Sequence, residues 1–156
     1  GFLNEHNTLR RTISDGKFYA QGKLMPAAST PIPALTWDCA LEQSAQEWAD
    51  GCVFEHSNQA GIGENLYWAW ASNGISLTGK GAAASKSWAK EFQDYGWKDV
   101  NLTMEVFNSG VGHATQMAAA RSTKIGCGMT SCADDTEALV VCQYTAASVV
   151  DGTRTH

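Results

Sequence analysis

The spacing of apolar residues predicts a helix at the start of the chain. Phe2, Leu9 and Ile13 fall on one face of a helix over residues 2–14, and an Asp-Gly pair follows as a stop. All three prolines then fall within residues 15–36, a stretch that is also rich in Ala, Ser and Thr. This composition predicts a long surface connection.

Two further stretches have helical periodicity. Residues 38–52 have an apolar face, with acidic and amide side chains on the opposite side. The residues of the apolar face are Leu41, Ala45, Trp48, Ala49 and Cys52. From about residue 80 to residue 92, Ala84, Trp88 and Phe92 recur every four positions. Both stretches are therefore predicted to be helices.

Two short β-rich runs close the chain. STKIGCGMT, around residue 125, and ALVVCQY, at residues 138–144, are joined by an acidic turn and indicate an antiparallel hairpin. Helices followed by a terminal hairpin favour an α+β fold over a doubly wound parallel sheet. The chain contains no repeat, low-complexity tract or break in composition, so we expect a single domain over residues 1–156.

Charge and cysteine content narrow the class of protein. The 11 basic residues are outnumbered by 16 acidic ones and are not clustered, which excludes a nucleic-acid-binding footprint. No run approaches the roughly 20 apolar residues of a transmembrane segment. Five cysteines are many for a cytosolic domain of this size and favour an extracellular, secreted protein. The triplet that begins at Asn101 permits glycosylation.

Four residues stand out as candidates for chemistry: His56 in FEHSN, Glu64 in GIGENLYW, Glu91 in SWAKEF and His113 in GVGHATQM. They spread over 58 positions, so spacing alone does not bring them together. Taken singly, each histidine is more often a hydrogen-bonded structural residue, and Glu91 a solvated or paired surface carboxylate. Glu64 follows two glycines, whose backbone freedom permits a turn that points its side chain inward.

The remaining polar and aromatic residues have more ordinary interpretations. His6 lies where the first helix should pack, and we expect it to cap the helix or to make a hydrogen bond in the core. The aromatic residues of YWAW, residues 67–70, could pack in the core or line a groove, and packing is favoured. GIGENL lacks the lysine and the preceding strand of a phosphate-binding loop, and the chain has no Gly-x-Ser-x-Gly elbow.

Together these motifs resemble the CAP superfamily of secreted proteins, which includes plant pathogenesis-related proteins, insect venom allergens and the activation-associated or venom-allergen-like proteins of parasitic nematodes. The resemblance covers nearly the whole chain, and GHATQMA and WDCALE are most similar to the nematode branch. The matching elements, in the order of the family, are HNTLR, CVFEHS, GENLY, SWAKE, VGHATQM and VVCQY.

The resemblance implies a three-layer α-β-α sandwich with a central antiparallel sheet. It also implies that His56, Glu64, Glu91 and His113 meet in a cavity where the two histidines bind a divalent metal, commonly zinc. Two histidines alone would form an open and weak site, because catalytic zinc usually takes three protein ligands. One glutamate could complete a set of two histidines and one glutamate, or both could accept the histidine N–H groups and orient the rings.

The function expected from the resemblance is non-enzymatic, through binding of host proteins or small lipids and modulation of host immunity. One alternative is a carrier of sterols or fatty acids. Another is a metal-dependent hydrolase that uses the same four residues, with one glutamate as general base. The histidine and glutamate residues are thus candidates for catalysis only in the last case.

The resemblance further implies two disulfides, Cys127 with Cys142 and Cys52 with Cys132, which leaves Cys39 over. The Cys52–Cys132 bond would close a loop of about 80 residues and stabilise the fold by roughly 4 kcal/mol.

The chain departs from the family after GHATQM, where a tryptophan is expected and residues 118–120 are alanines. Loss of a buried tryptophan costs roughly 3–5 kcal/mol if nothing fills the space. It also departs after VVCQY, where the family has a segment like x-P-x-G-N.

Overall fold

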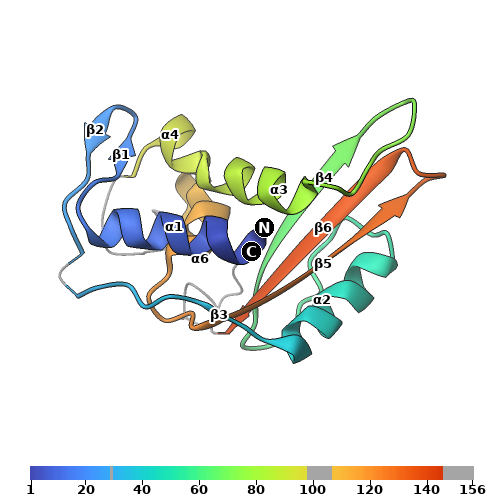
Figure 1. Cartoon of the computed structure of the whole chain (residues 1–156), viewed down its shortest axis with the longest axis horizontal. Coiled ribbons are helices and arrows are strands. Elements are labelled where there is room, and N and C mark those ends of the chain that lie inside the picture. Colours follow the sequence, from blue (N-terminus) through green and yellow to red (C-terminus); the bar gives the residue numbers. More distant parts are fainter. Residues whose placement is uncertain (29, 98–106, 146–156) are drawn as a thin grey trace.

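A four-stranded sheet lies between two layers of helices in the computed structural model, which describes residues 1–28, 30–97 and 107–145 (Figure 1). The strand order is β3-β5-β6-β4. Their bounds are Thr36–Trp37 for β3, Gly63–Trp70 for β4, Lys124–Cys132 for β5 and Glu137–Thr145 for β6. This arrangement confirms the α+β class and the α-β-α sandwich.

The sheet is mixed rather than wholly antiparallel. β5, β6 and β4 pair antiparallel, as predicted for the terminal hairpin, whereas β3 joins β5 in parallel. Two backbone hydrogen bonds form the parallel pairing, from Thr36 N–H to the carbonyl of Thr123 and from Asp38 N–H to that of Ile125. The pairing is short because a helix begins at the next residue, Cys39.

One helix covers one face of the sheet. α2, Cys39–Asp50, begins where the Asp38 side chain accepts a hydrogen bond from Leu41 N–H at 2.9 Å, an N-cap that satisfies a free helix donor. Ala45, Ala49 and Leu66 are among the residues of the small core beneath it. This helix was predicted from its periodicity at residues 38–52.

The other face carries the remaining helices and the larger core (Figure 1). Their bounds are Phe2–Ser14 for α1, Lys80–Ala89 for α3, Glu91–Tyr95 for α4 and Gly112–Ala118 for α6, and the segment Phe107–Val111 before α6 is kinked at Gly110. α1 was predicted with the same start and end. The stretch predicted as one helix over residues 80–92 is divided at Lys90 into α3 and α4.

The connection from residue 15 to residue 36 is more ordered than the surface loop that its composition predicted. It contains a two-stranded hairpin of β1, Tyr19–Ala20, and β2, Lys23–Leu24. Ala20, Met25 and Leu35 are buried against the larger core, which anchors the segment in spite of its prolines.

A buried arginine joins α1 to the end of α6. Arg10 is 1% exposed and its guanidinium donates to the backbone carbonyls of Pro33, Met117, Ala119 and Ser122. Burial lowers the pKa of Arg10 to about 10, although Tyr144 opposes this shift. The planar guanidinium, with its five N–H donors, can serve four carbonyls at once, which a lysine cannot do.

The alanine run that departs from the family lies at the end of α6. Ala118 is buried, Ala119 is half-buried and Ala120 is exposed. The cost expected for a fully buried tryptophan is therefore an upper limit at this position.

Both expected disulfides are present. Cys127 and Cys142 face each other in the pairing of β5 with β6, and Cys52 is bonded to Cys132 across a sequence separation of 80. Cys39 is exposed and free. Over the residues described, no helix has the length and apolar character to cross a membrane.

Candidate functional site

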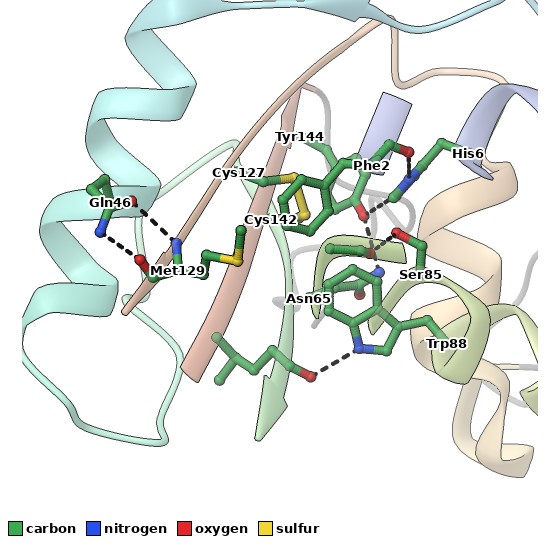
Figure 2. The surroundings of a disulfide bond; sticks show 12 residues. Phe2, His6, Gln46, Asn65, Ser85, Trp88, Cys127, Met129, Cys142 and Tyr144 are labelled. Carbon is green, nitrogen blue, oxygen red and sulfur yellow. Dashed lines mark hydrogen bonds between the residues drawn. A yellow bond between two sulfur atoms is a disulfide. The ribbon is translucent and has the colours of Figure 1, made fainter. Parts of the chain in front are cut away.

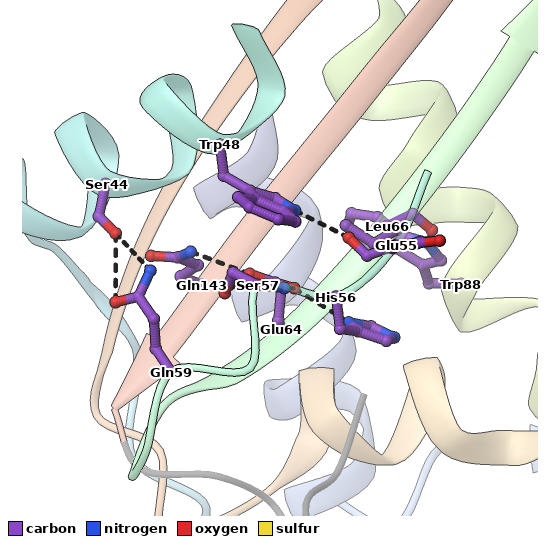
Figure 3. A network of polar contacts seen from close by, with 10 residues as sticks. All are labelled: Ser44, Trp48, Glu55, His56, Ser57, Gln59, Glu64, Leu66, Trp88 and Gln143. Carbon is purple, nitrogen blue, oxygen red and sulfur yellow. Dashed lines mark hydrogen bonds and ion pairs between the residues drawn. The ribbon is translucent and has the colours of Figure 1, made fainter. Parts of the chain in front are cut away.

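The first histidine–glutamate pair lies where strand β4 begins. Glu64 is the second residue of β4, not part of a glycine-rich turn as predicted, and it faces Gln143 across the sheet. His56 comes from the loop between α2 and β4, and its Nδ1 lies 3.0 Å from Glu64 Oε1. Figure 3 shows the two side chains meeting beneath α2, beside Gln143.

Glu64 is almost fully buried and both of its oxygens are bound. Oε1 also accepts from Ser57 N–H at 2.8 Å, while Oε2 accepts from Ser57 Oγ at 2.6 Å and Gln143 Nε2 at 2.9 Å. Burial raises the pKa of this carboxyl, but the hydrogen bonds from His56, Ser57 and Gln143 together hold the pKa below its ordinary value. Glu64 is therefore a carboxylate at neutral pH.

The second pair joins the short helices on the opposite face. His113, near the start of α6, places its Nδ1 at 2.7 Å from Oε2 of Glu91, the first residue of α4. Glu91 Oε1 accepts the backbone N–H groups of His113 and Ala114, at 2.9 and 3.0 Å. The carboxylate thus fixes both the histidine ring and the first turn of α6. Trp88 stacks on the ring at 6.1 Å between centroids.

Strand β4 connects the two pairs through neighbouring residues. Asn65, which follows Glu64, donates through Nδ2 to the carbonyl of His113 at 3.1 Å and to the Tyr144 hydroxyl at 3.2 Å. That hydroxyl lies 2.6 Å from Nε2 of His6. The chain of contacts from His6 through Tyr144 to Asn65 can be followed in Figure 2.

His6 has the core role expected from the sequence. It is fully buried, and its Nδ1 lies 2.8 Å from the Phe2 carbonyl, which can only accept. Nδ1 therefore carries the proton, and Nε2 accepts from Tyr144. Burial is the main cause that lowers the pKa of His6 to about 4, although the bond to Phe2 opposes it.

The structure therefore arranges the four candidate residues as two pairs. His56 is bound to Glu64 and His113 to Glu91, and the pairs are related through the adjacent residues 64 and 65 of β4. The described part of the chain holds no group of three or more His, Cys, Asp and Glu residues able to bind a metal. The set of two histidines and one glutamate is thus not assembled in this conformation.

Three polar partners were missed in the sequence: Ser57, Gln143 and Asn65. Ser57 and Gln143 hold Glu64, and Asn65 holds the backbone of His113. All three fall inside matched motifs, HS, CQY and GEN, and that was the signal available. The sequon at Asn101 lies outside the described residues.

Imidazole nitrogens are ligands that divalent ions such as zinc accept, and each of the two rings is oriented by a carboxylate. Because a carboxylate occupies Nδ1 in each ring, Nε2 is the nitrogen through which His56 and His113 would coordinate. Their side chains are 21% and 31% exposed, so solutes reach them. Both glutamates have their oxygens engaged by N–H or O–H donors, which suits them to orient the rings rather than to act as ligands.

Comparison with known proteins identifies the relatives of this chain. The model of the cysteine-rich secretory protein family, CAP, matches residues 3–144. Venom allergen 3 of Solenopsis invicta is 32% identical over 171 residues, which cover 96% of this chain and 68% of the relative. The Ancylostoma secreted protein of Ancylostoma caninum is 33% identical over 153 residues, which cover 92% of this chain but only 35% of that protein.

Solved structures agree with the sequence relatives. The structure of BmVAL-1 superimposes with a TM-score of 0.89 at 35% identity, over 96% of this chain and 77% of that one. The crystal structure of NaASP2 with Zn2+ gives a TM-score of 0.83 at 30% identity, over 98% of this chain and 84% of that one.

Proposed function

This chain belongs to the CAP, or cysteine-rich secretory protein, family, and we propose that it is an extracellular protein that works by binding rather than by catalysis. Its partners are host proteins, as expected for a relative of nematode secreted proteins, and modulation of host immunity is the outcome of that binding. The two disulfides support the extracellular location, since such bonds persist in oxidising compartments.

The observation that carries this proposal is the engagement of both carboxylates. Each oxygen of Glu64 and Glu91 accepts at least one hydrogen bond from a histidine, a backbone N–H or a neighbouring side chain. A general base needs a lone pair directed at a substrate or water, and a third metal ligand needs one directed at the ion. Both oxygens of Glu64 and Oε1 of Glu91 already accept two such bonds, and Oε2 of Glu91 is bound to the His113 ring, so the geometry favours binding over hydrolysis.

A divalent cation, with zinc as the expected one, is the second part of the proposal. His56 and His113 would hold it through Nε2, with Glu64 and Glu91 fixing the rings. When bound, such an ion supplies a concentrated positive charge that polarises an oxygen atom of a ligand. This chain's own contribution is to fix each imidazole ring on a carboxylate before binding, which lowers the entropy that the ring loses on coordination.

The lipid carrier is a weaker alternative. A hollow of about 570 Å³ is lined by Phe2, Leu3 and Trp37 together with polar residues of α1, and it is open to solvent. None of the four histidine and glutamate residues lines it. Native mass spectrometry that recovered a bound sterol or fatty acid would replace host-protein binding by carriage.

Zinc titration by calorimetry tests the cation site. We expect His56→Ala and His113→Ala each to weaken zinc binding by at least tenfold, because each removes one of two ligands. Glu91→Gln should weaken it by about 10–100-fold, the usual effect of losing a carboxylate that orients a ligand. The control is Glu47→Gln, which changes an exposed carboxylate on α2. Unchanged affinity in both histidine variants would refute the site.

Turnover assays test the absence of catalysis. With zinc added, fluorogenic peptides and esters should be hydrolysed no faster by the wild-type protein than by His113→Ala. Turnover that His113→Ala abolishes would overturn the binding role in favour of the metal-dependent hydrolase.

A further inference from the structure

Four large apolar side chains are exposed together at one end of the sheet. Val53, Phe54, Trp68 and Trp70 are 44%, 58%, 46% and 59% exposed, and we refer to them as the sheet-end patch. Figure 1 shows β4, β5 and β6 extending at this end beyond the helices on both faces. The preference for core packing of the aromatic run at residues 67–70 is therefore wrong for its two tryptophans.

Covalent and strand contacts bring the members of the patch together. The Cys52–Cys132 disulfide holds Val53 and Phe54 at the end of β5. Cys132 pairs with Glu137, and Glu137 pairs with Trp70 on the far side of β6. The Trp48 indole also donates to the carbonyl of Glu55 at 2.8 Å, which holds the loop against α2.

The tryptophans continue the face that α2 covers further along the sheet. Leu66 packs in the core beneath α2, and side chains two and four residues further along a strand lie on the same face. Trp68 pairs with Leu139, which belongs to the core beneath α2, so Trp68 lies on that face beside the helix. Trp70 pairs with Glu137 and lies further along the same face, towards the end of the sheet. Apolar side chains in such a position are typical of a binding surface.

The same part of β4 is also an edge of the sheet. β4 pairs with β6 on one side, and the strand order gives it no neighbour on the other among the residues described. The carbonyl of Leu66 points to this outer edge, because it accepts from the Trp88 indole at 2.9 Å. The peptide groups of Trp68 and Trp70 point the same way, since alternate residues of an antiparallel strand share one edge.

Charge around the patch has a single sign. Residues 50–55, 68–76 and 130–137 contain five acidic residues and no basic one: Asp50, Glu55, Asp134, Asp135 and Glu137. All except the half-buried Glu137 are exposed. A partner that fits this surface must therefore bring apolar side chains together with positive charge.

We propose that the outer edge of β4 and the sheet-end patch bind an extended segment of a partner protein in which apolar residues alternate with Lys or Arg. The segment adds to the sheet as a strand beside β4, so that its backbone pairs with the peptide groups of Trp68 and Trp70. Its apolar side chains cover the tryptophans. Its Lys or Arg side chains point to the other face of the added strand and reach the acidic side chains of the turn between β5 and β6, which contains Asp134 and Asp135. This deepens the binding role proposed above and rests on it, but it does not use the histidine–glutamate pairs.

A model peptide tests the surface. The probe is a labelled ten-residue peptide of alternating Lys and Val, titrated by fluorescence anisotropy. We expect the double variant Trp68→Ala/Trp70→Ala to weaken binding at least tenfold, while Tyr19→Ala, which removes an equally exposed ring from the distant β1, binds as wild type. Equal binding by the double variant would overturn the proposal.

Chemical variants of the peptide test the mode of binding. Replacement of Lys by Glu should abolish binding. Methylation of the backbone nitrogens of either the Lys or the Val residues blocks one edge of the peptide strand. We expect one of these two methylated peptides to lose at least tenfold in affinity and the other to bind as tightly as the unmethylated peptide. A peptide methylated at both sets of nitrogens has no free edge, and undiminished affinity of that peptide would exclude strand addition.

Two controls separate this proposal from its alternatives. Phosphatidylcholine vesicles should not bind, and their binding in place of the peptide would replace the protein partner by a membrane surface. His113→Ala should bind the peptide as wild type, and the double tryptophan variant should bind zinc as wild type. If the wild-type protein binds zinc but not the peptide, only the peptide-binding surface is refuted. If it binds the peptide but not zinc, only the cation site is refuted.

Discussion

At the scale of single residues, the environment of each histidine decides its role. His6 is buried with a carbonyl on one nitrogen and a hydroxyl on the other, and it is neutral. His56 and His113 are partly exposed and each contacts a carboxylate, which stabilises an N–H group on the facing nitrogen. The same type of side chain therefore packs in the core at His6 and belongs to the candidate cation site at His56 and His113.

The neutral His6 predicts a loss of stability in mild acid. Its pKa is lowered from 6.5 to about 4, so the unfolded chain binds more protons between these values and the free energy of unfolding falls as the pH falls through this window. The full loss is of the order of 3 kcal/mol for a shift of this size. Urea unfolding at pH 7, 5.5 and 4.5 measures it.

The control for this effect is His6→Gln, which has no titrating ring at that position. Although less stable at pH 7, it should lose less stability than the wild type between pH 7 and 4.5. Glu64, whose lowered pKa gives stability that is lost in stronger acid, is present in both proteins and cancels in the comparison. Parallel curves for the two proteins would contradict the assignment to His6.

At the scale of elements, the close approach of α2 to β5 depends on two glycines. A Cβ at Gly126 would lie 2.1 Å from the backbone nitrogen of Glu42, and one at Gly128 would lie 2.5 Å from the Cα of Gln46. The obstacles are backbone atoms of a helix, which cannot move aside alone. Strand β5 therefore carries small residues on the face where the helix lies.

Gly126→Ala is expected to destabilise the protein by about 3 kcal/mol or more, because overpacking here must displace α2. The measurement is the urea midpoint at pH 7. Gly51→Ala is the matched control, since its Cβ would meet only the carbonyl of Trp48 at 3.3 Å and its φ of −71° suits alanine. A similar small effect in both variants would show that α2 shifts freely on the sheet.

At the scale of the whole molecule, the two disulfides fasten different parts of the sandwich. Cys127–Cys142 is buried between two strands that already pair, as Figure 2 shows, and it closes a separation of 15 residues. Cys52–Cys132 is more accessible and ties the loop that carries His56 to the end of β5. This second bond therefore supports both the candidate cation site and the sheet-end patch.

Mild reduction of the native protein should open Cys52–Cys132 first. In the chain-entropy model its loss costs roughly 4 kcal/mol, and the freed loop should weaken zinc binding. Alkylation of Cys39 beforehand prevents exchange, and mass spectrometry of alkylated peptides identifies the reduced pair. Cys52→Ser/Cys132→Ser should reproduce the loss of zinc affinity. First reduction of Cys127–Cys142 would contradict the expected order.

The local periodicity of apolar residues was sufficient to predict the helices and strands that bury one face in the core. The helix at residues 2–14, the helix at residues 38–52 and the terminal hairpin were all predicted, because repeats of 3.6 and 2 residues are written into consecutive side chains. β4 was missed because Gly61 and Gly63 suggest a turn. Gly63 instead lies in the strand, where a Cβ would be 2.2 Å from Gln116 Oε1.

The amino-acid sequence by itself determined the α+β class and, through the family resemblance, the CAP family and both disulfide pairs. It also named the four histidine and glutamate residues as candidates. Only the tertiary structure decided that these residues form two pairs, with Ser57, Gln143 and Asn65 as partners, and that Trp68 and Trp70 are exposed. The physical reason is the separation along the sequence over which each kind of contact acts. Helix and strand periods act between near neighbours, whereas Glu64 meets Gln143 only because β4 and β6 pair across 79 positions.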